Sequence, residues 1–128
     1  MSQTILVIDD DRDLADTCAR VLKAAGFACL VAYDSPMALS LFDSSRPALV
    51  LSDINLPTSD GYEIARYVKQ KASGTPVILM TTYHHGNAPQ QAAKAGAAGF
   101  LRKPFANVEL IATVKLLLDH GKTQDPAD

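Results

Sequence analysis

The chain has 128 residues, of which 48% are hydrophobic and 20% charged, and its net charge is −2. This length suits one domain with one core, and the composition excludes a disordered chain. The slight acidity excludes the basic footprint of a nucleic-acid-binding protein, and no apolar run approaches the ~20 residues that span a bilayer. We recognise no signal peptide and no disulfide framework, so we expect a cytoplasmic protein with Cys18 and Cys29 as small core residues.

The first part of the chain alternates short apolar runs with helical patterns. Residues 4–8 (TILVI) predict a buried strand, and residues 13–26 have helical spacing. A second strand is predicted at 28–33, a second helix at 35–45 and a third strand at 48–53. Runs that are apolar throughout are typical of strands covered by helices on both faces.

The same alternation continues through the second part of the chain. A helix is predicted at 60–72, a strand at 76–81 and a helix at 87–96. A fifth strand follows at 98–102 and a closing helix at 107–121. Five strand–helix pairs with right-handed crossovers predict a doubly wound α/β domain with a parallel sheet.

The predicted helices carry recognisable start and stop residues. Asp11 is a suitable N-cap for the first helix, which ends at Gly26. Ser35 is the predicted N-cap of the second helix. Asp60 is the predicted N-cap of the third helix, and Glu63 three residues later completes a capping box. We assign 1–121 to the domain and predict that 122–128 form a flexible tail or the start of a linker.

Polar residues follow the strands at one edge of the predicted sheet. Asp9 and Asp10 follow the first strand, Asp53 ends the third, Thr81 ends the fourth and Lys103 follows the fifth. In a doubly wound sheet, ligands bind outside the carboxyl ends of the strands, so these side chains are expected in one crevice. Taken alone, the acidic triplet is equally well explained by a solvated helix start.

Three carboxylates in one crevice need compensating positive charge. Lys103 supplies one unit, and a hard divalent cation is expected to supply the rest. Mg²⁺ suits such a site, because it takes oxygen ligands and needs only one or two carboxylates beside water and phosphate. A carboxylate in this setting can attack phosphorus and form an aspartyl phosphate.

Four segments resemble the receiver domain of two-component response regulators. They are VIDDD at 7–11, LSDINLPTSDG at 51–61, ILMTT at 78–82 and GFLRKPF at 99–105, and the resemblance covers about 3–120. It implies a flavodoxin-like (βα)5 three-layer sandwich with strand order 2-1-3-4-5. It also implies that Lys103–Pro104 is a cis peptide bond.

The resemblance assigns roles to the residues of the crevice. It implies that Asp53 accepts the phosphoryl group, that Asp10 binds Mg²⁺ directly and that Asp9 binds it mainly through water. The backbone carbonyl of Asn55 is expected as a further ligand. Lys103 is expected to pair with the phosphoryl group.

The resemblance also implies a switch and a control on hydrolysis. Thr81 is expected to hydrogen-bond the phosphoryl group, and Phe100 occupies the aromatic switch position. Thr82 is bulkier than the alanine common there and is expected to restrict Phe100. Asn55 and Tyr83 would flank the path of attacking water, and we expect Tyr83 to slow hydrolysis unless it points to solvent. His84 and His85 are read as a solvated loop, since no third ligand stands at metal spacing.

The function implied is a phosphorylation-dependent signalling switch, not an enzyme beyond its own phosphorylation and dephosphorylation. The expected donor is a histidine kinase or phosphotransfer protein, and the expected target a downstream protein or a tethered output domain. Nucleic acid and membrane are not expected as partners, and the domain is expected to be a monomer or a weak phosphorylation-dependent dimer. Phosphorylation is expected to rearrange the surface formed by the fourth helix, the fifth strand and the fifth helix.

Two other functions are alternatives for a chain with these acids. A Mg²⁺-dependent aspartyl-phosphate phosphatase or phosphotransferase would pair its acids as D-x-D after the first strand and carry a cap domain. Here the first acids are adjacent, the expected nucleophile follows the third strand, and 128 residues are expected to leave no room for a cap. A flavodoxin-like FMN carrier would need a phosphate-binding loop where this chain has DDDRD. The sequence does not distinguish a stand-alone receiver from the first domain of a longer regulator.

Overall fold

The computed structural model describes residues 3–82 and 87–123 and has five strands and five helices in strict alternation. The strands are β1 Thr4–Ile8, β2 Ala28–Ala32, β3 Leu49–Asp53, β4 Val77–Thr81 and β5 Gly99–Arg102. The helices are α1 Arg12–Ala24, α2 Ser35–Ser45, α3 Gly61–Lys71, α4 Ala88–Lys94 and α5 Asn107–Thr123. The predicted elements are all present, and α5 runs two residues beyond its predicted end at 121.

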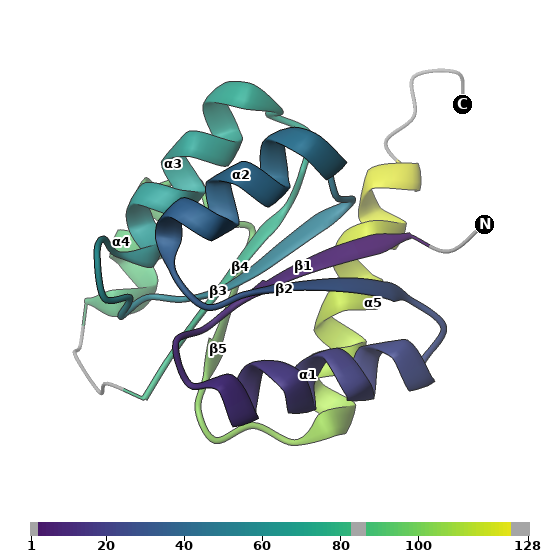
Figure 1. The fold of residues 1–128 in the computed structure, drawn as a ribbon. Coiled ribbons are helices and arrows are strands. Elements are labelled where there is room, and N and C mark those ends of the chain that lie inside the picture. Colours follow the sequence, from purple (N-terminus) through teal and green to yellow (C-terminus); the bar gives the residue numbers. More distant parts are fainter. Residues whose placement is uncertain (1–2, 83–86, 124–128) are drawn as a thin grey trace.

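The five strands form one parallel sheet in the order β2-β1-β3-β4-β5. Helices α1 and α5 cover one face, and α2, α3 and α4 cover the other (Figure 1). Successive residues of β1 alternate between the two cores: Ile5 and Val7 pack toward α1 and α5, and Leu6 and Ile8 toward the other layer. The predicted doubly wound fold and its strand order are therefore confirmed.

Two of the three predicted N-caps, Asp11 and Asp60, are confirmed, and the predicted C-cap Gly26 lies one residue after the observed C-cap Ala25. Asp11 accepts from the Leu14 amide at 3.1 Å, and Asp60 accepts from the Glu63 amide at 3.0 Å. Gly26 has a φ of +105°, which a residue with a side chain rarely adopts, and it follows the end of α1. The two cap hydrogen bonds mark where α1 and α3 start.

The N-cap predicted at Ser35 is wrong by one residue. Asp34 has extended backbone angles, and its carboxylate accepts from the Met37 amide at 2.9 Å. Ser35 is instead the first helical residue and is buried. Asp and Ser are equally good N-cap residues. Asp34 is the cap here because its carboxylate binds the amide of Met37, the third residue of α2.

Cys18 is buried, as predicted, and burial raises its pKa to about 11. Cys29 is only partly buried, because it lies on β2, an edge strand of the sheet.

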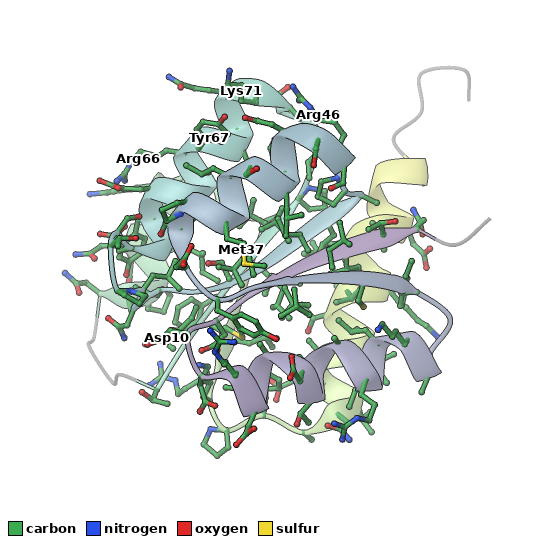
Figure 2. All side chains as sticks on the ribbon, viewed as in Figure 1. Asp10, Met37, Arg46, Arg66, Tyr67 and Lys71 are labelled. Atoms are coloured by element: carbon green, nitrogen blue, oxygen red, sulfur yellow. The ribbon has the colours of Figure 1, made fainter. Side chains whose placement is uncertain are left out.

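On the other face of the sheet, the Tyr67 hydroxyl donates to the Asp43 carboxylate at 2.8 Å, and Arg46 donates to the Lys71 carbonyl at 3.2 Å (Figure 2). These contacts hold α2 and α3 together.

None of the helices in the described part of the chain combines the length and apolarity needed to cross a bilayer.

Candidate functional site

The carboxyl ends of β1 and β3 bring acidic side chains to the same edge of the sheet. Asp9 directly follows β1 and its side chain is fully buried, while Asp53 is the last residue of β3 and is 7% exposed. Asp10 lies in the turn before α1 and is exposed (Figure 2). Each of the three carboxylates offers an oxygen within 4.8 Å of the others.

Lys103 connects the two buried carboxylates. Its ammonium nitrogen lies 2.8 Å from Asp9 Oδ2 and 3.2 Å from Asp53 Oδ2. Its side chain is only 9% exposed, and its own amide donates to the Thr81 carbonyl at 2.8 Å. The Lys103–Pro104 peptide is cis, as the family resemblance implied. The loop after β5 therefore places one cation between two anions.

Backbone amides orient the remaining carboxylate oxygens. The Asp11 amide donates to Asp9 Oδ1 at 3.0 Å, and the Asn55 amide donates to Asp53 Oδ1 at 3.2 Å. In both cases the donor lies two residues after the acid. Sequence reasoning missed these donors, because every residue except proline carries an amide and only the turn geometry selects one.

The electrostatic environment raises the pKa values of both Asp53 and Lys103. For Asp53, burial is the largest cause and the nearby Asp9 charge adds to it, while Lys103 and the Asn55 amide lower the pKa in part. For Lys103, burial alone would lower the pKa, but the hydrogen bond to Asp9 and the charges of both acids outweigh it. An ammonium ion therefore remains charged between the two acids at neutral pH.

The donor set fits a hard divalent cation. All three groups are carboxylates, two are buried and one faces solvent, which leaves room for water ligands. Asn55 lies in the β3–α3 loop, two residues after Asp53, and is exposed. Whether its carbonyl takes part remains a prediction from the family.

Thr81 and Phe100 lie on neighbouring strands on the α4 side of this crevice. Thr81 ends β4, is 2% exposed and lines a cleft of about 490 Å³ with Ile54 and Asn55. Phe100 is partly buried and packs against the core on the α2–α4 side of the sheet. Thr82 is exposed. Their proposed roles in switching remain predictions.

Three residues for which the sequence predicts a role or a conformation lie outside the residues that the structure describes. They are Tyr83, whose expected effect is on hydrolysis, and His84 and His85.

Comparisons with known proteins agree with this arrangement. Residues 5–115 match the family described as response regulator receiver domain. The chain is 34% identical to response regulator MprA of Mycobacterium bovis (strain BCG / Pasteur 1173P2) over 128 residues, which is 100% of this chain and 56% of the relative. It is 33% identical to the MprA of Mycobacterium avium (strain 104), covering 97% of this chain and 54% of that one.

Solved structures show the same fold. The CheY-like receiver domain protein of Methanospirillum hungatei JF-1 superposes with a TM-score of 0.92 at 25% identity, covering 97% of this chain and 99% of that one. Chemotaxis response regulator CheY4 of Vibrio cholerae superposes with a TM-score of 0.85 at 27% identity, covering 91% and 99% of the two chains.

A parallel (βα)5 sandwich with an acidic crevice at the strand ends defines a receiver-type signalling domain. The chain belongs to the response regulator receiver domain family. It spans about half the length of the curated relatives it matches.

The raised pKa of Asp53 predicts a stability change with pH. A carboxyl whose pKa in the folded state lies above its ordinary 3.8 binds its proton more tightly when the protein is folded. Its contribution to stability is therefore fully present below pH 3.8 and is lost as the pH rises through the raised pKa. In chelator at neutral pH, Asp53→Asn is expected to raise the free energy of unfolding, because it removes a buried negative charge that the folded state disfavours.

Denaturant unfolding between about pH 4 and 8 measures this effect. The variant should also lose part of the wild-type decline with pH. Asp119→Asn, at an exposed site on α5, is the matched control and should behave as wild type. A lower stability for Asp53→Asn at neutral pH would show that its charged form is favoured by folding.

Proposed function

We propose that this domain is a phosphorylation-dependent switch that accepts a phosphoryl group on Asp53 from a histidine kinase or phosphotransfer protein. The observation that carries the proposal is the Lys103 ammonium, which contacts both Asp9 and Asp53 beside the exposed Asp10. A buried nucleophilic carboxylate with a fixed cation at bonding distance suits phosphoryl transfer, whose transition state spreads negative charge over the phosphoryl oxygens.

Each polar group of the crevice has a defined task in this proposal. An Asp53 oxygen attacks phosphorus while the bond between phosphorus and the donor nitrogen breaks. Lys103 and the Thr81 hydroxyl then bind phosphoryl oxygens. Asp10 would hold Mg²⁺ directly, with Asp9 acting through water and the Asn55 carbonyl as a further ligand. When bound, Mg²⁺ supplies positive charge beside the transferring group.

The signalling part of the proposal links Asp53 to the surface made by α4, β5 and α5. Thr81 would move toward the phosphoryl group and Phe100 would change rotamer, so two arrangements of that surface exchange. Clefts on the two sides of α4, one of about 490 Å³ and one of about 200 Å³, leave space for such movement. The surface would control a downstream protein or a tethered output domain.

The alternative of an aspartyl-phosphate phosphatase or phosphotransferase has no specific observation in its favour. The family match and the receiver relatives support the switch. Catalysis in the proposed function is limited to the domain's own phosphorylation and dephosphorylation, where Tyr83 is proposed to slow water attack. A cytoplasmic location belongs to the same proposal, because histidine-kinase signalling implies it.

Incubation with acetyl phosphate or carbamoyl phosphate and Mg²⁺ tests the proposal. Wild type should gain the mass of one phosphoryl group per chain as an acid-stable, base-labile adduct, and Asp53→Asn should gain none. Asp119→Asn, with an exposed carboxylate on α5, should react as wild type. The adduct should also shift amide signals over 88–105, and full labelling of Asp53→Asn would refute the acceptor assignment.

A further inference from the structure

Gly61, the first residue of α3, is packed against the backbone of Asp53. A Cβ atom at this position would lie 2.5 Å from the Asp53 carbonyl oxygen and 2.9 Å from Ile54 Cα. Such distances do not occur in folded proteins, so any side chain here would force one of the two segments to move. Gly61 does not have a positive φ. The reason for glycine is therefore close approach of two backbone segments.

Gly61 also closes the neck of the loop that follows Asp53. Its amide donates to the Ile54 carbonyl at 2.8 Å, and Asn55 pairs with Asp60 in an isolated antiparallel bridge. Residues 55–60 thus form a loop whose two ends are bonded to each other. The same neck holds the Asn55 amide 3.2 Å from Asp53 Oδ1.

The strand side of this contact has little freedom to retreat. The Ile54 amide donates to the Met80 carbonyl at 2.9 Å, and β3 lies at the centre of the sheet between β1 and β4. A side chain at position 61 would therefore displace the loop and the start of α3. That displacement would break the bonds at the neck and carry the Asn55 amide away from the carboxylate.

We propose that Gly61 is a positioning residue for Asp53: its bare Cα lets the β3–α3 loop close against the Asp53 peptide and present the Asn55 amide to Asp53 Oδ1. With Lys103 on Oδ2 and this amide on Oδ1, both oxygens of the carboxylate are oriented. The part of this inference that concerns phosphorylation rests on the proposed function. The part that concerns the loop stands on geometry.

Gly61→Ala and Gly74→Ala make a matched pair for the test. Both add one methyl group, but a Cβ at Gly74 would meet nothing within 4 Å. Gly61→Ala is expected to be phosphorylated by acetyl phosphate about 10- to 100-fold more slowly, because misplacement of a reacting group by about 1 Å costs rate on that scale. Gly74→Ala should stay within about twofold of wild type.

Amide hydrogen exchange separates positioning from general damage. In folded Gly61→Ala, the Asn55 amide should exchange faster than in wild type, while amides of β1 and β4 should keep their protection. A slower reaction with an unchanged Asn55 amide would overturn the proposal, as would an unchanged rate. If wild type itself gains no phosphate, the proposed function fails and Asn55 exchange alone decides the role of Gly61.

Wild type provides a measurement that does not depend on the variant folding. The Gly61 amide should be protected to the level of the β3 amides, because its bond to Ile54 opens only when the neck opens. The Ser59 amide, in the same loop but not a donor in the hydrogen bonds of the neck, is the internal reference and should exchange faster. Equal, rapid exchange of both amides would show that the neck is not closed and would overturn the proposal.

Discussion

Lys103→Met is expected to slow phosphorylation of Asp53 by at least about 10²-fold and, at the same time, to tighten Mg²⁺ binding. The two effects have opposite signs because Lys103 plays two parts. Its ammonium would stabilise the phosphoryl oxygens during transfer, and before transfer it neutralises the carboxylates that would bind the metal. Removing one positive charge a few ångströms from the site should raise Mg²⁺ affinity by at least about threefold.

The same substitution should destabilise the metal-free protein. Asp9 is fully buried and would lose its cation, and breaking a buried ion pair by removing one partner costs about 3–5 kcal/mol. Mg²⁺ should restore much of that loss, because it supplies the missing positive charge. Thermal unfolding in chelator and in Mg²⁺, together with calorimetric Mg²⁺ titration and phosphorylation rates, measures all three effects.

Lys115→Met is the matched control, since Lys115 is exposed on α5 and takes no part in the ion pairs of the crevice. It should leave the rate, the metal affinity and the stability as in wild type. Weaker Mg²⁺ binding in Lys103→Met would contradict the view that the ammonium offsets the negative charge that attracts the metal. A rate near that of wild type would remove Lys103 from the transfer step.

The sequence predicted that the acidic side chains and Lys103 would lie together, because each of them stands at or just after the end of a strand. Asp9, Asp53 and Thr81 stand where apolar runs stop, and a parallel sheet brings all such ends to one edge. The fold class followed from the five alternations in the same way. The strand order came from the family resemblance, since the hydrophobic pattern of a strand does not identify its neighbours.

Other features depend on geometry that residue types do not encode. Asp34 and Ser35 are both competent caps, and the backbone angles together with the bond from the Met37 amide identify Asp34 as the cap. Cys29 looks like a core residue until β2 is known to be an edge strand. Gly61 stands in a recognisable Ser-Asp-Gly turn, but its contact with Asp53 joins two ends of a loop and is visible only in three dimensions.

Asp9 and Asp10 differ in burial and in the contacts that they make. Asp9 is fully buried, and its oxygens already bind the Lys103 ammonium and the Asp11 amide. Asp10 is exposed at the mouth of the crevice and lies within reach of the same centre. We therefore expect that a cation arriving from solvent would meet Asp10 without displacing Lys103, whereas direct ligation by Asp9 Oδ2 would have to break a 2.8 Å ion pair.

Asp10→Asn is accordingly expected to weaken Mg²⁺ binding by about 10²-fold or more, and Asp9→Asn by about tenfold, the range typical of residues that support a ligand from outside. Each variant removes one negative charge from the same place, so the difference between them isolates direct coordination from long-range attraction. Asp13→Asn, exposed in the first turn of α1, reports the effect of a nearby charge alone and should change affinity by less than about threefold. Calorimetric or NMR titration of the three variants measures the order. Equal losses for Asp9 and Asp10 would mean that Lys103 yields Asp9 to the metal, and a larger loss for Asp9 would reverse the assignment of the direct ligand.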